Sequence, residues 1–238
     1  MTEMLVTIAI LGVLSGAVFS QMDQVQQRAG TEQVKVDDFQ EARDFVDQFF
    51  RDINQVGYPN SRMADTASGL WVPPLAAPLY NDSRLAMGLV RIDNNELRFE
   101  GDTNGNGTVE SIVYMINGSG TCALCLQRSQ VDKVTGDPIA AQTQSWGTEV
   151  NDVVSAAIYG YYDTNGNLIA AASLPADVST ATGRTILASV KTIKISLTIR
   201  NNAVLDTKTN QAIETNFEGE VSINNCSMAA SAQPMSCN

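Results

Sequence analysis

The first nineteen residues constrain this chain more than any other stretch. They read MTEMLVTIAILGVLSGAVF, in which Glu3 stands directly before an apolar run from Met4 to Phe19 whose only polar side chains are Thr7 and Ser15. A helix this apolar must be buried in lipid or against other apolar helices. The run is slightly shorter than the roughly 20 residues that span a bilayer core. An ionisable group at its edge is costly without a partner charge, which makes Glu3 a candidate functional residue.

The run does not have the pattern of a cleavable secretory signal. Such a signal begins with a basic segment and ends in small residues at a cleavage site. Here no Lys or Arg precedes Arg28, and no such small-residue site follows the run.

The composition argues against several classes of function. With 26 acidic and 15 basic residues the formal charge is −11, a poor footprint for nucleic acid, so no nucleic-acid partner is expected. The chain has no histidine, which removes His-based acid–base catalysis and His-containing zinc sites. No phosphate-cradling loop and no catalytic constellation emerges. We therefore expect neither an enzyme nor a bound cofactor.

Downstream of the apolar run the pattern predicts more helix. Apolar residues between Val34 and Ile53 recur at three- and four-residue steps with charges on the other face, as in an amphipathic helix. Gly57-Tyr58-Pro59 is a stop signal. The expected organisation is one helix over residues 1–57, apolar through 27 and amphipathic over 28–57, followed by a globular head over 58–238.

Two glycines lie inside the apolar run. Gly12 and Gly16 have the small-xxx-small spacing that lets helices approach closely in lipid. Glycine also weakens a helix by roughly 1 kcal/mol relative to alanine, so the same pair is a candidate for helix flexibility.

The rest of the chain reads as short β-strands separated by turns, with irregular stretches at 58–88 and 129–148. Together with the long helix they predict an α+β fold in which an antiparallel sheet packs against the helix. The expected strands are Leu89–Ile92, Glu96–Glu100, Val109–Ile116, Thr121–Arg128, Val153–Tyr162, Leu168–Ala172, Val190–Arg200 and Phe217–Ile223.

One glycine-rich turn matches the first half of a calcium loop. Asp102, Asn104 and Asn106 stand at alternate positions and Gly107 follows, as in the start of an EF-hand loop. The twelfth position, where an acid is expected, is Val113, and Glu110 falls at the ninth. A hairpin turn without a metal is the favoured interpretation, with calcium as the alternative.

The string from Thr2 to Gly12, TEMLVTIAILG, resembles the mature N-terminus of type IV pilins and pseudopilins. The resemblance implies that a prepilin peptidase clips a short leader and that the new N-terminus is methylated. It also implies that the helix anchors the subunit in the inner membrane and later forms the filament core. Glu3 then corresponds to the glutamate that pairs with the N-terminal amine of a neighbouring copy. The residues expected in the membrane and the filament core are Met4, Leu5, Val6, Ile8, Ile10, Leu11, Val13, Leu14 and Phe19.

The chain departs from the family at one point, because the family glutamate is the fifth mature residue and here it is the third. Either two mature residues precede this sequence, which is the preferred interpretation, or the N-terminus is shortened. Loose motifs in the head resemble the PilW group of minor pilins, including residues 50–58, 102–114 and 161–166. The roles left open are a major pilus subunit in a filament of adhesion or motility, a minor pilin or pseudopilin in assembly or type II secretion, and a membrane-anchored adhesive module.

An exported chain of this family would carry oxidised cysteines. The resemblance to pilins with a C-terminal disulfide favours a Cys226–Cys237 bridge, with Cys122–Cys125 as the second pair. Cross-pairing stays open. For the CxxC pair, redox and zinc roles are the less favoured alternatives to a structural disulfide.

Overall fold

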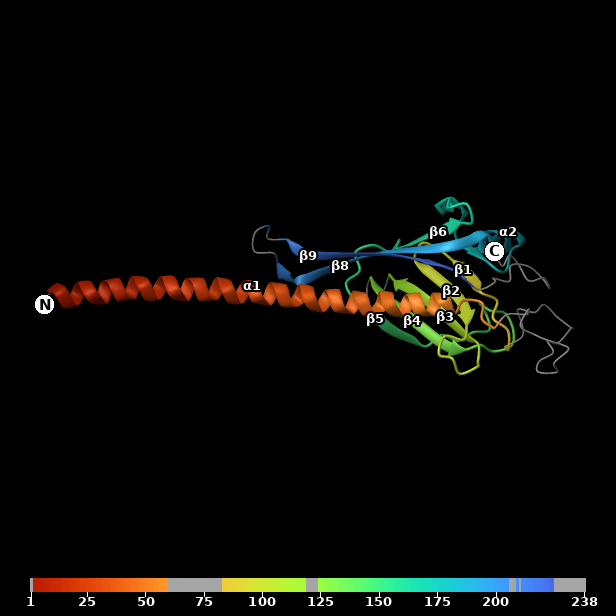
Figure 1. Cartoon of the computed structure of the whole chain (residues 1–238), viewed down its shortest axis with the longest axis horizontal. Helices are drawn as coiled ribbons and strands as arrows, with labels where there is room; N and C mark the ends of the chain where they lie inside the picture. The colour runs from red at the N-terminus through yellow and green to blue at the C-terminus, as the bar shows by residue number, and fades with distance from the viewer. Residues whose placement is uncertain (1, 60–82, 119–123, 206–208, 210, 225–238) are drawn as a thin grey trace. The chain divides into compact units, whose positions relative to one another are not determined.

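The computed structural model describes residues 2–59, 83–118, 124–205, 209 and 211–224 (Figure 1). The chain divides into two compact units, Met1–Gln40 with Arg200–Thr215, and Glu41–Ile199 with Asn216–Asn238. The predicted cysteine pairs and most of the irregular stretch at 58–88 lie outside the described residues, apart from Cys125.

The long helix is confirmed. Helix α1 (Thr2–Asn54) is unbroken and runs from the first unit into the second (Figure 1). It ends three residues before Gly57, whose φ of 77° lies in the left-handed region that glycine adopts without strain. The predicted stop signal therefore acts where expected.

The first unit contains α1 as far as Gln40 and the paired ends of two strands, β8 (Val190–Leu205) and β9 (Ala212–Ser222). Arg200 of β8 and Glu214 of β9 form an ion pair with 2.5 Å between Nη2 and Oε1. On α1, Thr31 is buried and donates a hydrogen bond to the carbonyl oxygen of Gln27.

The second unit contains two sheets. One has the order β5-β4-β3-β2-β1-β7 and the other has the order β6-β8-β9. From β1 to β5, each strand pairs antiparallel with the next one along the chain. Strand β7 pairs antiparallel with β1, and β6 pairs antiparallel with β8. The strand bounds are β1 (Leu89–Ile92), β2 (Glu96–Gly101), β3 (Glu110–Asn117), β4 (Cys125–Asp132), β5 (Trp146–Val150), β6 (Tyr159–Asp163) and β7 (Ala176–Asp177).

The part of α1 that belongs to this unit, Glu41 to Asn54, is the back of α1, and it packs against both sheets. The ring of Phe49 lies 5.4 Å from that of Tyr114 on β3 and 6.2 Å from that of Tyr159 on β6, centroid to centroid. At Gly219 on β9 an added Cβ would stand 2.6 Å from Cζ of Phe50, so a larger residue there would have to displace the Phe50 ring. The α+β class, a long N-terminal helix packed on an antiparallel β head, is therefore confirmed, with two sheets in place of the one expected.

Several strand predictions need correction. The fourth strand is displaced from Thr121–Arg128 to Cys125–Asp132, and its end and the start of β5 lie in the stretch expected to be irregular, 129–148. β5 escaped prediction because its residues are mostly exposed, and an edge strand needs no apolar alternation.

The region between residues 153 and 189 also differs. Val153 makes only an isolated bridge to Ile199, and β6 begins at Tyr159. The expected partner strand Leu168–Ala172 is reduced to one bridge between Tyr162 and Leu168, followed by the 3-10 helix η3 (Ala171–Ser173).

Helix α2 (Ala181–Ser189) was not predicted. The hydroxyl of Thr180 accepts a hydrogen bond from the backbone N–H of Gly183, which caps this short helix. Its only described buried side chain larger than glycine is that of Leu187, too little to create an apolar period in the sequence.

Candidate functional site

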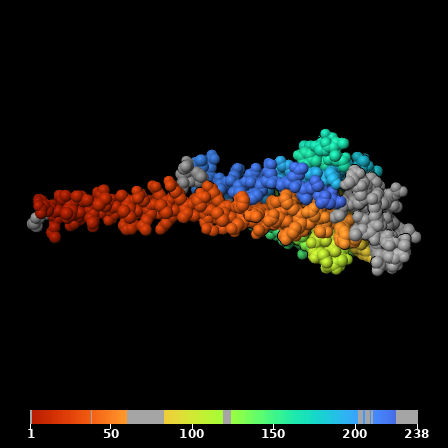
Figure 2. All heavy atoms as spheres, viewed as in Figure 1, coloured from red at the N-terminus to blue at the C-terminus, as the bar shows by residue number. Residues whose placement is uncertain are grey.

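The apolar run of α1 from Met4 to Phe19, the front of α1, has apolar side chains on every side, and they are exposed. One helix of the described chain, α1, is long and apolar enough to cross a membrane. Figure 2 shows its first turns (red) open to solvent on the face in view. Each large apolar residue between Met4 and Phe19 has between 54 and 75% of its surface exposed. These are Met4, Leu5, Val6, Ile8, Ile10, Leu11, Val13, Leu14, Val18 and Phe19.

Consecutive residues of a helix point about 100° apart, so an unbroken apolar run leaves no polar face. The buried or lipid-facing surroundings expected for this segment must therefore come from outside the described chain. Gly12 and Gly16 lie within the unbroken helix, and nothing stands within 4 Å of where their Cβ atoms would be. Close approach by another helix is sterically open at both positions.

Glu3 lies in the first turn of α1 and is exposed. A carboxylate there is favoured by the partial positive charge at the helix N-terminus. Within the described residues no ion pair involves Glu3. The structure therefore places an exposed carboxylate at the N-terminal edge of the apolar segment.

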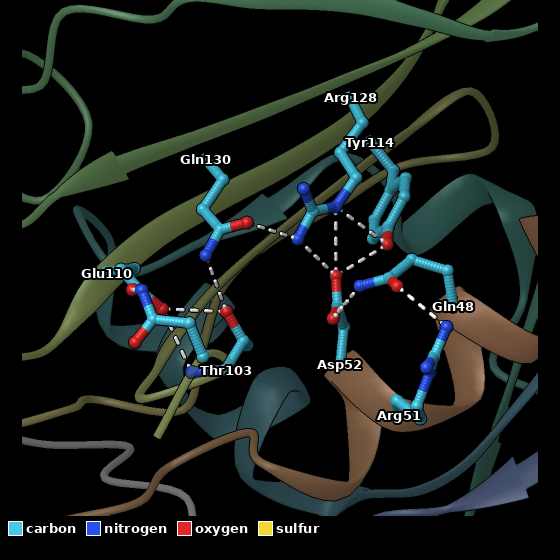
Figure 3. A network of polar contacts seen from close by, with 9 residues as sticks. Gln48, Arg51, Asp52, Thr103, Glu110, Tyr114, Arg128 and Gln130 are labelled. Atoms are coloured by element: carbon cyan, nitrogen blue, oxygen red, sulfur yellow. Dashed lines mark hydrogen bonds and ion pairs between the residues drawn. The ribbon is translucent and has the colours of Figure 1, made fainter. Parts of the chain in front are cut away.

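The back of α1 ends in a buried charge pair with β4 (Figure 3). Asp52 is 1% exposed, and its Oδ2 lies 2.7 Å from Nη2 of Arg128. The same oxygen accepts a hydrogen bond from the hydroxyl of Tyr114 at 2.6 Å, while Gln48 donates to Oδ1. A buried ion pair with its remaining lone pairs satisfied fixes geometry more than it adds stability, so the network specifies how the helix docks on the sheet.

The ionisation states of this network follow from burial and neighbouring charge. Burial raises the pKa of Tyr114 well above its usual range, and the charge of Asp52 raises it further, so the hydroxyl stays a donor. Burial alone would lower the pKa of Arg128, but Tyr114 and Asp52 outweigh it and raise that pKa. Tyr114 therefore stays a hydrogen-bond donor and Arg128 stays a cation within the network.

A second charge pair lies wholly inside the head. Nζ of Lys133 is 2.7 Å from Oε2 of Glu100, and both side chains have no exposed surface. The same ammonium donates to the carbonyl oxygen of Leu85, and the same carboxylate accepts from the backbone N–H of Met87. Desolvation raises the pKa of Glu100, although Lys133 opposes the rise. These contacts fasten the chain entering β1 to the sheet.

Sequence reasoning missed the Asp52–Tyr114–Arg128 network as a unit. The available signal was the position of Asp52, three residues after Phe49 and seven after Phe45, which places a carboxylate on the apolar stripe of α1. A charge on such a stripe needs a buried partner. Nothing in the sequence identified Arg128 as that partner, because the two residues are 76 positions apart.

The calcium candidate residues lie in the loop between β2 and β3. Asp102 is 6% exposed and its Oδ2 accepts from the backbone N–H of Gly107, whereas Asn104 and Asn106 are exposed. Antiparallel pairing of β2 with β3 makes the segment a hairpin loop. Among the described residues there is no group of three or more His, Cys, Asp or Glu side chains suited to a metal.

The head also contains a pocket of about 290 Å³. Gly160, Tyr162 and Leu168 line it, together with the ion-paired side chains of Lys194 and Glu218, whose Nζ and Oε2 are 2.9 Å apart.

Cys125 is disulfide-bonded. The other three cysteines lie outside the described residues, so the proposed pairings Cys122–Cys125 and Cys226–Cys237 stay predictions.

Neither a family model nor a curated protein matches this chain.

Proposed function

We propose that this chain is a structural subunit that polymerises through the front of α1 into a type IV pilus-like extracellular filament. In this proposal the front of α1 first holds the subunit in the bacterial inner membrane, where prepilin peptidase and the assembly machinery act on it. Other copies of the chain then replace lipid as the surroundings of the same helix. No nucleic-acid partner is part of the proposal.

The observation that carries the proposal is the contrast within one continuous helix. Its back end is locked into a β head by aromatic packing and a buried ion pair. Its front end carries ten large apolar side chains that no described residue covers. A helix that is apolar all round requires apolar surroundings on all sides, and the cores of a bilayer and of a helical bundle both provide them.

Glu3 supplies the specificity of assembly in this scheme. Burying an unpaired carboxylate among apolar helices costs several kcal/mol. A neighbouring copy whose N-terminal amine lies opposite Glu3 removes that cost, while a copy in another register does not. The charge pair therefore selects the register more than it strengthens the filament.

The direct test is Glu3→Gln in cells, with the yield of sheared surface filaments measured against the amount of subunit in the membrane. We expect filament yield to fall by tenfold or more while the membrane pool remains. The matched control is Asp44→Asn, which removes an exposed carboxylate on the same helix beyond the apolar run and should leave yield unchanged.

Normal filament yield in Glu3→Gln would refute the register mechanism. Filaments that consist mainly of another subunit would favour a minor pilin or pseudopilin that primes assembly or serves type II secretion. A head that adheres to a surface while no filament forms would favour the membrane-anchored adhesive module.

A further inference from the structure

The pentapeptide DTNGN occurs twice in this chain, at Asp102–Asn106 and at Asp163–Asn167. In both copies the glycine has a positive φ, 72° at Gly105 and 79° at Gly166. Identical sequence and a shared turn allow the surroundings of the two aspartates to be compared directly.

The second copy satisfies its own aspartate. Oδ1 of Asp163 accepts hydrogen bonds from the backbone N–H groups of Asn165 and Asn167, and Oδ2 accepts from Nδ2 of Asn167. These hydrogen bonds, led by that of the Asn167 backbone, lower the pKa of Asp163, which is partly exposed to solvent. This loop has no need of a ligand.

The first copy leaves its aspartate incomplete. Asp102 is 94% buried, and although its Oδ2 accepts from the N–H of Gly107 at 2.9 Å, its Oδ1 is buried without a hydrogen-bond partner. Because the two oxygens belong to one carboxylate, the bond to Gly107 holds the unpartnered oxygen at the loop. An unsatisfied buried carboxylate oxygen is expensive unless a cation meets it.

A second buried carboxylate lies against the same loop. Glu110 is 1% exposed, and it accepts hydrogen bonds from the N–H and hydroxyl of Thr103 and from the amide of Asn104. Figure 3 shows Glu110 beside Thr103, which in turn accepts from Gln130. A carboxylate has about four lone-pair sites, so three donors leave one free.

Charge balance separates these two carboxylates from the other buried ones. The buried acidic side chains in the described part of the chain are Asp52, Glu100, Asp102 and Glu110. Arg128 neutralises Asp52 and Lys133 neutralises Glu100, each at 2.7 Å. No ion pair in the described residues reaches Asp102 or Glu110, so two buried acidic side chains share one loop without a basic partner.

The loop already holds further oxygens in place. The N–H of Asn106 donates to Oδ1 of Asn104 at 2.9 Å, and the N–H of Thr108 donates to Oδ1 of Asn106 at 2.7 Å. Each amide oxygen has a second lone pair for a cation. Positions one, three and five followed by glycine at six, with φ of 84° at Gly107, match the front of an EF-hand loop.

We propose that this loop binds one Ca²⁺ through the side-chain oxygens of Asp102, Asn104, Asn106 and Glu110, with the backbone carbonyl at position 108 as a further ligand. Two carboxylates neutralise a divalent charge. A set made only of oxygen atoms, mixing carboxylate with neutral amide and carbonyl groups, suits Ca²⁺ better than a transition metal, and its irregular geometry disfavours Mg²⁺. Glu110 at the ninth position replaces the acid that an EF-hand supplies at the twelfth.

The test is calorimetric titration of the full chain in detergent micelles, after chelator treatment, with CaCl₂ and separately with MgCl₂. We expect one Ca²⁺ per chain with a dissociation constant on the order of 10⁻⁴ M, the range of extracellular modules. At ten times that concentration Tm should rise by about 3–6 °C. Mg²⁺ should bind more weakly.

Three isosteric variants make the assignment specific. Asp102→Asn and Glu110→Gln should each weaken Ca²⁺ binding by about tenfold or more, because affinity follows ligand charge. Asp163→Asn changes the same residue in the same pentapeptide and should leave binding and the rise in Tm unchanged. The absence of saturable Ca²⁺ binding by the unaltered chain up to 10 mM, or a loss in Asp163→Asn equal to that in Asp102→Asn, would overturn the proposal. If Asp102→Asn fails to fold, the Glu110→Gln and wild-type titrations still decide the matter.

Discussion

The two ends of α1 differ in how their apolar side chains are satisfied. At the back, Ala42, Phe45, Phe49 and Ile53 are almost wholly buried within one β-rich unit. At the front, residues of comparable hydrophobicity are more than half exposed. The back has a single apolar stripe, which the β head of the same chain buries, whereas the front is apolar on all sides. Periodicity, rather than hydrophobicity alone, therefore distinguishes a helix that folds onto its own chain from one that requires other molecules.

The largest expected effect comes from shortening an aromatic side chain at the back. Phe49→Ala removes a ring in contact with Phe45, Tyr114 and Tyr159 and should lower the free energy of unfolding of the head by about 3–5 kcal/mol. Urea unfolding in detergent, followed by tryptophan fluorescence, measures this. The matched control at the front, Phe19→Ala, should change the unfolding free energy of the head by less than about 0.5 kcal/mol. Equal losses in the two variants would remove the distinction between the ends.

A charge introduced at the front should weaken membrane insertion and leave the stability of the head unchanged. Leu14→Lys places an ammonium near the middle of the apolar run and should cost about 3 kcal/mol in membrane insertion, while the unfolding free energy of the head stays unchanged. The fraction of subunit retained in alkali-washed membranes reports the loss. Val25→Lys, on the same helix but past the run, is the control and should remain in the membrane. A head destabilised by Leu14→Lys would show that the front belongs to the folded core.

The smallest expected effect is a pH dependence of the stability of the head, through Tyr159, which packs against the back of α1. Tyr159 lies against Phe49, and burial raises the pKa of its phenol well above the usual 10. The folded state therefore holds this proton more tightly than the unfolded state does. The corresponding stability is complete below pH 10 and is lost as the pH rises above it, at up to about 1.4 kcal/mol per pH unit.

Tyr159→Phe removes this dependence without removing a hydrogen bond, because the hydroxyl has no partner. Thermal unfolding between pH 9 and 11.5 should show a shallower fall in Tm for the variant, with little difference from wild type at pH 7. Tyr58→Phe, a matched change at a side chain with 37% of its surface exposed, should leave the slope as it is in wild type. An unchanged slope in Tyr159→Phe would mean that the ring is accessible to solvent.

The sequence predicted the features that depend on local pattern. The extent of α1, its stop near Gly57, the strand at 89–92 and most of the strands at 96–101 and 190–205 follow from periodicity and turn residues. The last of these was expected to end at Arg200 and continues to Leu205. Sequence reasoning missed β5 and α2, which bury little, and the division of the strands into two sheets. The ion pairs of Asp52 with Arg128 and of Glu100 with Lys133 join residues 76 and 33 positions apart, and no local pattern encodes such distances.

The close approach of Gly219 to Phe50 has a consequence for synthesis. Phe50 leaves the ribosome early, but β9, which carries Gly219 and Val221, is the last described strand of the head. At about 5–20 residues per second, the aromatic stripe of α1 stays without its final cover for roughly 10–35 s. The front of α1 is translated first. In the proposed function this order delivers the membrane anchor long before the head can close, so the incomplete head would be tethered at the bilayer during that interval.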